Sequence, residues 1–256
     1  MVMVLVELLG SGNAFLPSGR LHSFLAIDRH IIVDCPPTAL ASLRIAGISP
    51  ADIDTILITH VHGDHVFGFP FLLLERKYIS DREGLKTLTV AGSSGVKERL
   101  TQLCKLAYPG SLEEMIDTIN WVDIPEVKGW KMERFEVLHD PDVDPHGWML
   151  QNEQGWSMIH SGDSGPFEEL WNRIGKCSFA IVEMGVPEWV DTEHHHKPSD
   201  IISLAKRFPN TKIVVTHTYI DSDYQIVTTD VPDFPENVIH GNDGMRFELD
   251  SNGQLL

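Results

Sequence analysis

The stretch His60-Val61-His62-Gly63-Asp64-His65 places four side chains that can bind metal ions within six residues. It follows the apolar run 54–59, which predicts a buried β-strand. Side chains on a turn that leaves a strand are held by a rigid scaffold and remain open to substrate. The pattern H-x-H-x-D-H therefore predicts a metal site at the end of a strand. The alternative is a polar loop rich in histidine, and the density and mixed ligand types argue against it.

The composition is that of an ordinary soluble globular protein, with 256 residues, 42% hydrophobic and 22% charged. No apolar run reaches the roughly 18 residues of a membrane span. The apolar start, residues 1–9, contains Glu7 and lacks a basic leader, which favours a first strand over a signal peptide. The cysteines, Cys35, Cys104 and Cys177, are widely spaced and odd in number, so we expect buried thiols and a cytoplasmic, reducing compartment.

The formal net charge of −17 makes nucleic acid a less favoured partner. Lysine and arginine are scattered along the chain and form no basic patch. Bound divalent cations would offset part of the negative charge locally.

Hydrophobic patterning and turn residues predict strands and helices in alternation after an initial meander. The expected strands are 3–9, 23–28, 30–34, 54–59, 86–91, 118–123, 131–139, 147–152, 156–161, 178–184, 212–216 and 245–249. The expected helices are 37–46, 66–78, 95–107, 165–174 and 199–208. Turn residues predict that Gly47 follows the end of the first helix and that hairpin turns lie at 152–155 and 242–244. No flexible linker divides the chain, so we expect one domain over residues 1–256, with two mixed β-sheets packed face to face and helices outside.

Three further candidate ligands fall where predicted strands end. His139 closes the strand pattern at 134–138, Asp163 follows 157–162 and His217 follows 212–216. A single histidine at a strand end is usually not a ligand. Together with the first cluster, however, strands that each deliver one ligand to the same sheet edge predict a shared site.

The chain now resembles the metallo-β-lactamase fold superfamily and, within it, the tRNase Z and phosphodiesterase-like branch. The resemblance covers most of the chain and rests on the stretches 9–14, 32–35, 58–65 with 68–72, 162–164 and 215–217. The 58–65 motif is highly specific, and the order and spacing of the others support it. The resemblance implies an α/β fold, the four-layer αβ/βα sandwich in which helices flank two mixed β-sheets.

The resemblance also implies a dinuclear metal site. His60, His62 and His139 would hold one divalent ion, Asp64, His65 and His217 the other, and Asp163 would bridge them. Imidazole and carboxylate ligands without thiolate suit Zn²⁺, and also Mn²⁺ or Fe²⁺. Two ions about 3.5–4 Å apart can share a hydroxide and clamp the charge that develops during phosphoryl displacement.

Some site assignments leave alternatives open. His146, in a turn, competes with His139 as third ligand, whereas His22, His30, His160 and His240 are expected to be structural. Asp34 is expected to hydrogen-bond behind the metals.

In the tRNase Z-like branch, a histidine about twenty residues before the last ligand protonates the leaving group. His196 lies 21 positions before His217 and is the preferred general acid, with His195 and then His194 as alternatives. Asp64 is counted as catalytic as well as metal-binding.

Three functions fit the sequence. The first is a metal-dependent phosphodiesterase for a small or cyclic nucleotide or another small phosphodiester. The second is a tRNA 3′-processing endonuclease of the tRNase Z type with a minimal arm, because Asp163 follows His139 by only 24 positions where such enzymes carry a long tRNA-gripping arm. The third is a non-catalytic metal-binding protein. The expected partner is a small phosphorylated substrate, with no membrane and with a homodimer allowed.

Overall fold

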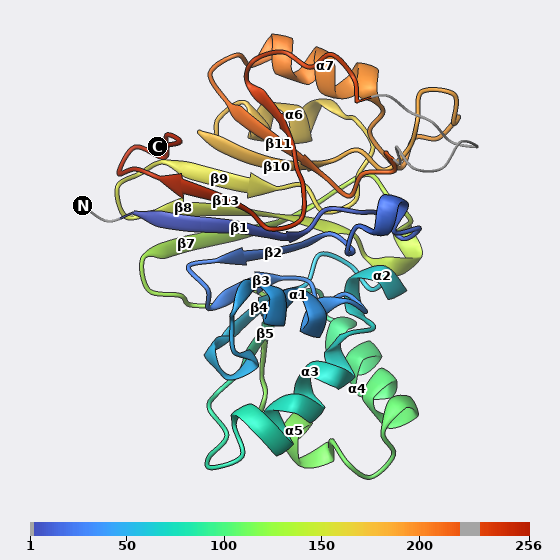
Figure 1. Ribbon diagram of the computed structural model, residues 1–256, viewed down its shortest axis with the longest axis vertical. Coiled ribbons are helices and arrows are strands. Elements are labelled where there is room, and N and C mark those ends of the chain that lie inside the picture. Colours follow the sequence, from blue (N-terminus) through green and yellow to red (C-terminus); the bar gives the residue numbers. More distant parts are fainter. Residues whose placement is uncertain (1–2, 221–230) are drawn as a thin grey trace.

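The computed structural model describes residues 3–220 and 231–256, and these residues form two β-sheets packed against each other (Figure 1). The first sheet runs, in spatial order, β13 (Met245–Leu249), β1 (Val4–Gly10), β2 (Phe24–Ile27), β3 (Ile31–Val33), β4 (Thr55–Leu57), β5 (Thr89–Ala91) and β6 (Asn120–Val122). The second runs β12 (Val238–His240), β11 (Lys212–Thr216), β10 (Phe179–Glu183), β9 (Ser157–His160), β8 (His146–Asn152) and β7 (Trp130–Glu136).

Helices cover the outer face of each sheet (Figure 1). The first sheet carries α1 (Ala39–Ala46), α2 (Gly63–Val66), α3 (Phe69–Glu75), α4 (Val96–Ala107) and α5 (Glu113–Thr118), and the second carries α6 (Glu168–Ile174) and α7 (Pro198–Arg207). Short helical turns are η1 (Pro17–Gly19), η2 (Pro50–Asp52), η3 (Arg76–Ser80) and η4 (Pro141–Val143). No helix in the described part of the chain is long and apolar enough to span a membrane.

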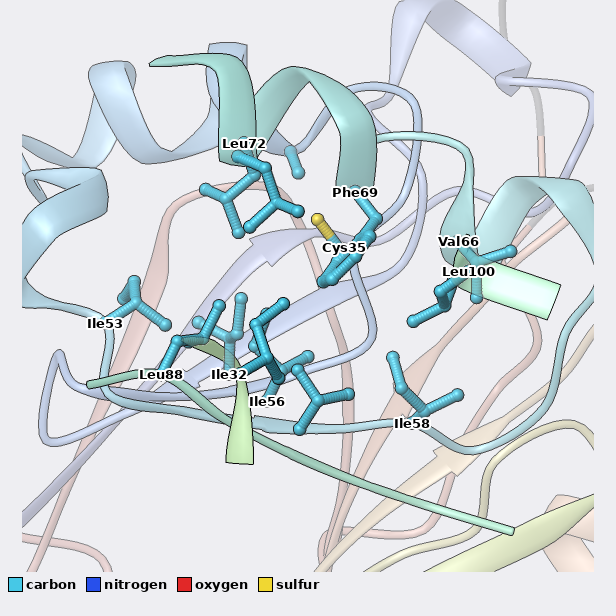
Figure 2. Close-up of a cluster of buried hydrophobic side chains, with 14 of the residues drawn as sticks. Ile32, Cys35, Ile53, Ile56, Ile58, Val66, Phe69, Leu72, Leu88 and Leu100 are labelled. Carbon is cyan, nitrogen blue, oxygen red and sulfur yellow. The ribbon is translucent and has the colours of Figure 1, made fainter. Parts of the chain in front are cut away.

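Side-chain alternation along the strands builds the layers. Ile31 and Val33 of β3 point into the core between the sheets, whereas Ile32 points to the helices. Strands buried on both faces read as continuous apolar runs, as these do. Figure 2 shows the helix-facing core, in which Ile32 and Ile56 lie below Phe69 and Leu72 of α3. The predicted four-layer α/β sandwich is therefore confirmed.

The parallel strands give the sheets a common edge. β3, β4, β5 and β6 run parallel to one another, and so do β9, β10 and β11. Within each sheet the carboxyl ends of these strands therefore lie together, and segments that follow different strands can meet there.

Three local expectations had different outcomes. Residues 152–155 form the predicted hairpin turn between antiparallel β8 and β9, and Gly47 ends α1 with a left-handed φ of 66°. The predicted hairpin turn at 242–244 is wrong, because this segment carries the chain from β12 in the second sheet to β13 in the first. Helix α5 and strand β12 were not predicted. Both are short, and β12 is half-buried throughout, so neither leaves a clear hydrophobic period.

Candidate metal centre

The candidate ligands lie where strands of both sheets end. His60 and His62 follow β4, and α2 begins at Gly63, so Asp64 and His65 occupy its first turn. His139 follows β7, Asp163 follows β9 and His217 follows β11. The structure thus brings all seven sequence-predicted ligands to the sandwich edge at which α2 lies (Figure 1).

Three imidazoles converge on the first subsite. The Nδ1 atom of His62 lies 3.1 Å from Nε2 of His60 and 3.2 Å from Nε2 of His139. The other ring nitrogen of His62 lies 3.6 Å from Oδ2 of Asp140. Three ring nitrogens within one small volume form a ligand set for a single ion.

The second subsite combines two carboxylates with two imidazoles. Oδ2 of Asp64 lies 3.5 Å from Nε2 of His65 and 3.3 Å from Nε2 of His217. Oδ2 of Asp163 lies 3.4 Å and 3.3 Å from the same two nitrogens, and 4.0 Å from Nε2 of His60. Asp163 therefore lies between the two subsites, where a bridging ligand must be.

A hydrogen-bond network fixes the ring tautomers. Asp34 accepts from the backbone N–H of Thr59 at 2.8 Å, from its hydroxyl at 2.9 Å and from Nδ1–H of His65 at 2.8 Å. The Thr59 oxygen in turn accepts from Nδ1–H of His60 at 3.0 Å, and Nδ1–H of His139 donates to the carbonyl of His194 at 3.1 Å. In all three rings the Nε2 lone pair therefore faces the site, as a metal ligand requires.

The electrostatics show that this cluster suits a cation. Burial lowers the pKa of His60 well below its usual value, which keeps the ring neutral. The pKa of Asp163 is held well below its usual range, since His217 and His65 outweigh its burial. Burial would lower the pKa of His65, but Asp163 and Asp34 outweigh it and raise this pKa. The buried Nε2 of His65 has no hydrogen-bond partner among the described residues. Buried carboxylates beside an unpartnered ring nitrogen favour a positive charge at this position, whether a proton or a metal ion.

The competing candidate His146 lies outside the cluster. Its backbone N–H donates to the carbonyl of Thr59 at 2.9 Å, and its Nδ1–H donates to the carbonyl of Asp144 at 2.8 Å. It belongs to none of the metal-ligand groups found among the described residues. The geometry therefore favours His139 over His146.

The structure argues against His196 as the general acid, because His196 is 0% exposed and both of its ring nitrogens are hydrogen-bonded within the protein. Its Nδ1–H donates to the carbonyl of Ser164 at 2.7 Å, and its Nε2 accepts from the indole N–H of Trp171 at 3.1 Å. Burial also lowers its pKa. A ring held in this way cannot reach a substrate.

His195, the alternative, does face the site. Its ligand atoms group with those of His139 and Asp163, and with those of Glu183 and His217. Its Nδ1–H donates to Oε1 of Glu183 at 2.9 Å, and its Nε2 has no hydrogen-bond partner among the described residues. Although burial acts in the opposite direction, Glu183 raises the pKa of His195 to about 9.

Glu183 is the site residue that sequence reasoning missed. It is 1% exposed and also accepts from the backbone N–H groups of Ser164, Gly185 and His196. It ends β10, between the strands that precede Asp163 and His217. The strand-end reasoning that found those two ligands would have found Glu183 as well.

The fold and the site together define a metal-dependent hydrolase built on a two-sheet sandwich, with a His/Asp cluster for divalent ions at one edge. A family profile described as "Beta-lactamase superfamily domain" matches residues 29–218, so the chain belongs to the β-lactamase superfamily.

Individual relatives agree with this family. The ribonuclease Z of Pyrobaculum aerophilum is 22% identical and aligns over 85% of this chain and 87% of its own length. The crystal structure of a diphosphatase from the PhnP family covers 96% of this chain and 98% of its own, with a TM-score of 0.72 and 15% identity. The short form of human tRNase Z covers 94% and 98%, with a TM-score of 0.72 and 18% identity. The structural matches bear out the fold, and the chain is a hydrolase of the tRNase Z- and PhnP-like type.

Proposed function

We propose that this chain is a divalent-metal-dependent phosphodiesterase whose substrate is a small or cyclic nucleotide or another small phosphodiester. The observation that carries the proposal is the segment between His139 and Asp163. It is filled by η4 and the β8–β9 hairpin, both of whose strands pair within the second sheet. No residue there is left over for the long arm expected of an enzyme that grips tRNA.

Two metal subsites are part of the proposal. His60, His62 and His139 would hold one ion, Asp64, His65 and His217 the other, and Asp163 would contact both. Nitrogen and oxygen ligands without sulfur suit Zn²⁺, with Mn²⁺ or Fe²⁺ as further candidates. When bound, such ions act as Lewis acids on a phosphoryl oxygen and lower the pKa of water.

The side chains of the protein position the reacting groups. Asp34 and Thr59 hold the imidazoles of His65 and His60 with their lone pairs turned inward. Glu183 holds His195 by Nδ1, so that Nε2 can carry a proton to the leaving oxygen of the substrate. Because the buried Glu183 carboxylate stabilises imidazolium, His195 is supplied in the protonated form that a general acid needs.

The test compares kcat/KM for a small or cyclic diester with that for a precursor tRNA at near-physiological ionic strength. We expect the small diester to be the better substrate. A small diester carries one charge, whereas RNA binding normally draws on several Lys/Arg–phosphate contacts, which a chain of charge −17 disfavours. Metal analysis of the same preparation should approach two equivalents per chain. A fixed stoichiometry of one after Zn²⁺ or Mn²⁺ is added would contradict the dinuclear site.

The second candidate is a tRNA 3′-processing endonuclease. It is supported by the relatives named ribonuclease Z, since the Pyrobaculum aerophilum protein aligns over 85% of this chain. Efficient, site-specific 3′ cleavage of the precursor tRNA in the same comparison would place this function first.

A further inference from the structure

A cavity of about 480 Å³ lies at the same sandwich edge as the metal centre. One wall comes from the segments that follow β5 and β6, and these strands run parallel to β4, which delivers His60. The other wall comes from β7 and the start of β8, where His146 is hydrogen-bonded to the carbonyl of Thr59. None of the candidate metal ligands lines the cavity. Its volume falls within the roughly 300–1,000 Å³ of small-molecule sites.

The apolar part of the cavity includes a fixed aromatic ring. Trp121 lines it together with Val90, Val96 and Val122. The indole is held from behind, since its N–H donates to the carbonyl of Ile116 at 3.4 Å and Phe69 packs 6.2 Å from it, centroid to centroid. A rigid aromatic surface of this kind favours contact with another planar ring.

The polar part offers donors that the protein leaves unused. Nε and Nη2 of Arg134 donate to Asp123, whereas its Nη1 is buried and has no hydrogen-bond partner among the described residues. Lys97, in the first turn of α4, forms no ion pair in the described part of the chain. Leaving a buried donor unpaired is destabilising, so an acceptor on a bound molecule would be favoured at this position.

The cavity also presents acceptors. The exposed carboxylates of Glu136 and Asp144 line it, and Asp123 adds a third. Three carboxylates outnumber the two cationic side chains, Lys97 and Arg134, so the cavity disfavours a highly charged anion. Carboxylates are, however, good partners for sugar hydroxyls.

We propose that this cavity binds the nucleoside moiety of the phosphodiester whose phosphate lies at the metal centre. The base packs against Trp121, Lys97 and Arg134 donate to base acceptors, and the carboxylates accept from sugar hydroxyls. This inference rests on the proposed phosphodiesterase function and narrows its substrate class to nucleotides.

The test uses two diesters with the same leaving group, thymidine 5′-(4-nitrophenyl) phosphate and methyl 4-nitrophenyl phosphate. One carries a nucleoside where the other carries a methyl group, so the ratio of their kcat/KM values measures the contribution of the nucleoside to transition-state binding. Base–aromatic contacts of about 1.4–2.7 kcal/mol, the middle of their usual range, correspond to a ratio of about 10 to 100 in favour of the thymidine diester. Ser94→Trp, at an exposed position on the cavity wall, should lower this ratio at least about tenfold.

A matched pair of charge reversals supplies the control. Lys97 and Lys105 are both exposed on α4, but only Lys97 lines the cavity. Lys97→Glu should lower the ratio, and Lys105→Glu should leave it unchanged. Equal kcat/KM values for the two diesters in the unmodified protein, or equal effects of the two reversals, would overturn the nucleoside site while the phosphodiesterase function stands.

Calorimetry gives a readout that does not depend on turnover. The metal-loaded protein should bind thymidine 5′-monophosphate at least about tenfold more tightly than methyl phosphate, and Ser94→Trp should remove this difference. If neither diester is hydrolysed, the proposed function fails, and the calorimetric comparison still decides on the cavity. Equal affinity for the two phosphates would refute it.

Discussion

Replacing Asp34 by asparagine should weaken metal binding without unfolding the protein. Asp34 has a φ of 67°, in the left-handed region that asparagine tolerates better than most residues, and the two side chains have the same shape. The carboxylate accepts from three donors, namely Thr59 N–H, Thr59 O–H and His65 Nδ1–H. The amide of asparagine has one oxygen and one NH₂ group. In either orientation its NH₂ group therefore faces one of these N–H or O–H donors. The tautomer with the His65 lone pair at Nε2 is then no longer enforced.

Loss of such an orienting partner typically lowers metal affinity about 10- to 100-fold, which corresponds to about 1.4–2.7 kcal/mol. The assay is a competition titration with a chelator of known affinity, and thermal unfolding of the metal-free protein separates folding from binding. Asp54→Asn is the matched control, because Asp54 pairs with His30 at 3.1 Å in an exposed position outside the site. Affinity within threefold of the unmodified protein for Asp34→Asn would refute the tautomer reasoning.

Three further outcomes follow from the site. His195→Ala should retain metal and lower turnover by about 10²–10⁴-fold, with a larger effect on esters that have poor leaving groups. His194→Ala, at the exposed neighbouring position, should change neither metal content nor turnover. Equal slowing of activated and unactivated esters by His195→Ala would contradict the proton-donor role. Asp163→Ala should abolish hydrolysis and release metal from both subsites, because the Asp163 carboxylate lies between them. Elemental analysis measures the release, and retention of both ions would exclude Asp163 as a bridging ligand. His196→Ala should act on stability, lowering the free energy of unfolding by about 2–3 kcal/mol in a denaturant titration, since it removes two buried hydrogen bonds; an unchanged midpoint with lost turnover would restore His196 to the reaction.

The sequence predicted the ligand cluster because ligand position is coupled to strand position. Each strand is an apolar run that can be recognised locally, and the rule that parallel strands end at a common edge then brings His139, Asp163 and His217 to the motif at 60–65. No pairing of distant residues had to be known in advance. Glu183 lies at the same edge, but it falls inside the predicted strand 178–184, whereas the other ligands follow their strands.

The general acid could not be predicted in the same way. His194, His195 and His196 lie between the end of β10 and the start of α7, where no regular period relates neighbouring side chains. Which ring faces the metals depends on distant partners, namely Glu183 for His195, and Ser164 and Trp171 for His196. The turn at 242–244 failed for a similar reason, because local turn residues do not reveal that the chain changes sheets there.

The ligands are spread along the chain, and this spacing bears on how the protein matures. In the proposed second subsite His217 lies 153 positions after Asp64, so one ion there would tie together segments that are far apart in the chain. Closing a loop of that length costs about 4–5 kcal/mol of chain entropy, and this cost no longer opposes ion binding once β11 has docked. During synthesis, the motif at 60–65 emerges long before its last partner and cannot yet complete a bridged centre. We therefore expect the proposed bridged centre to form late in folding, and release of its ions should loosen the junction between the two halves first.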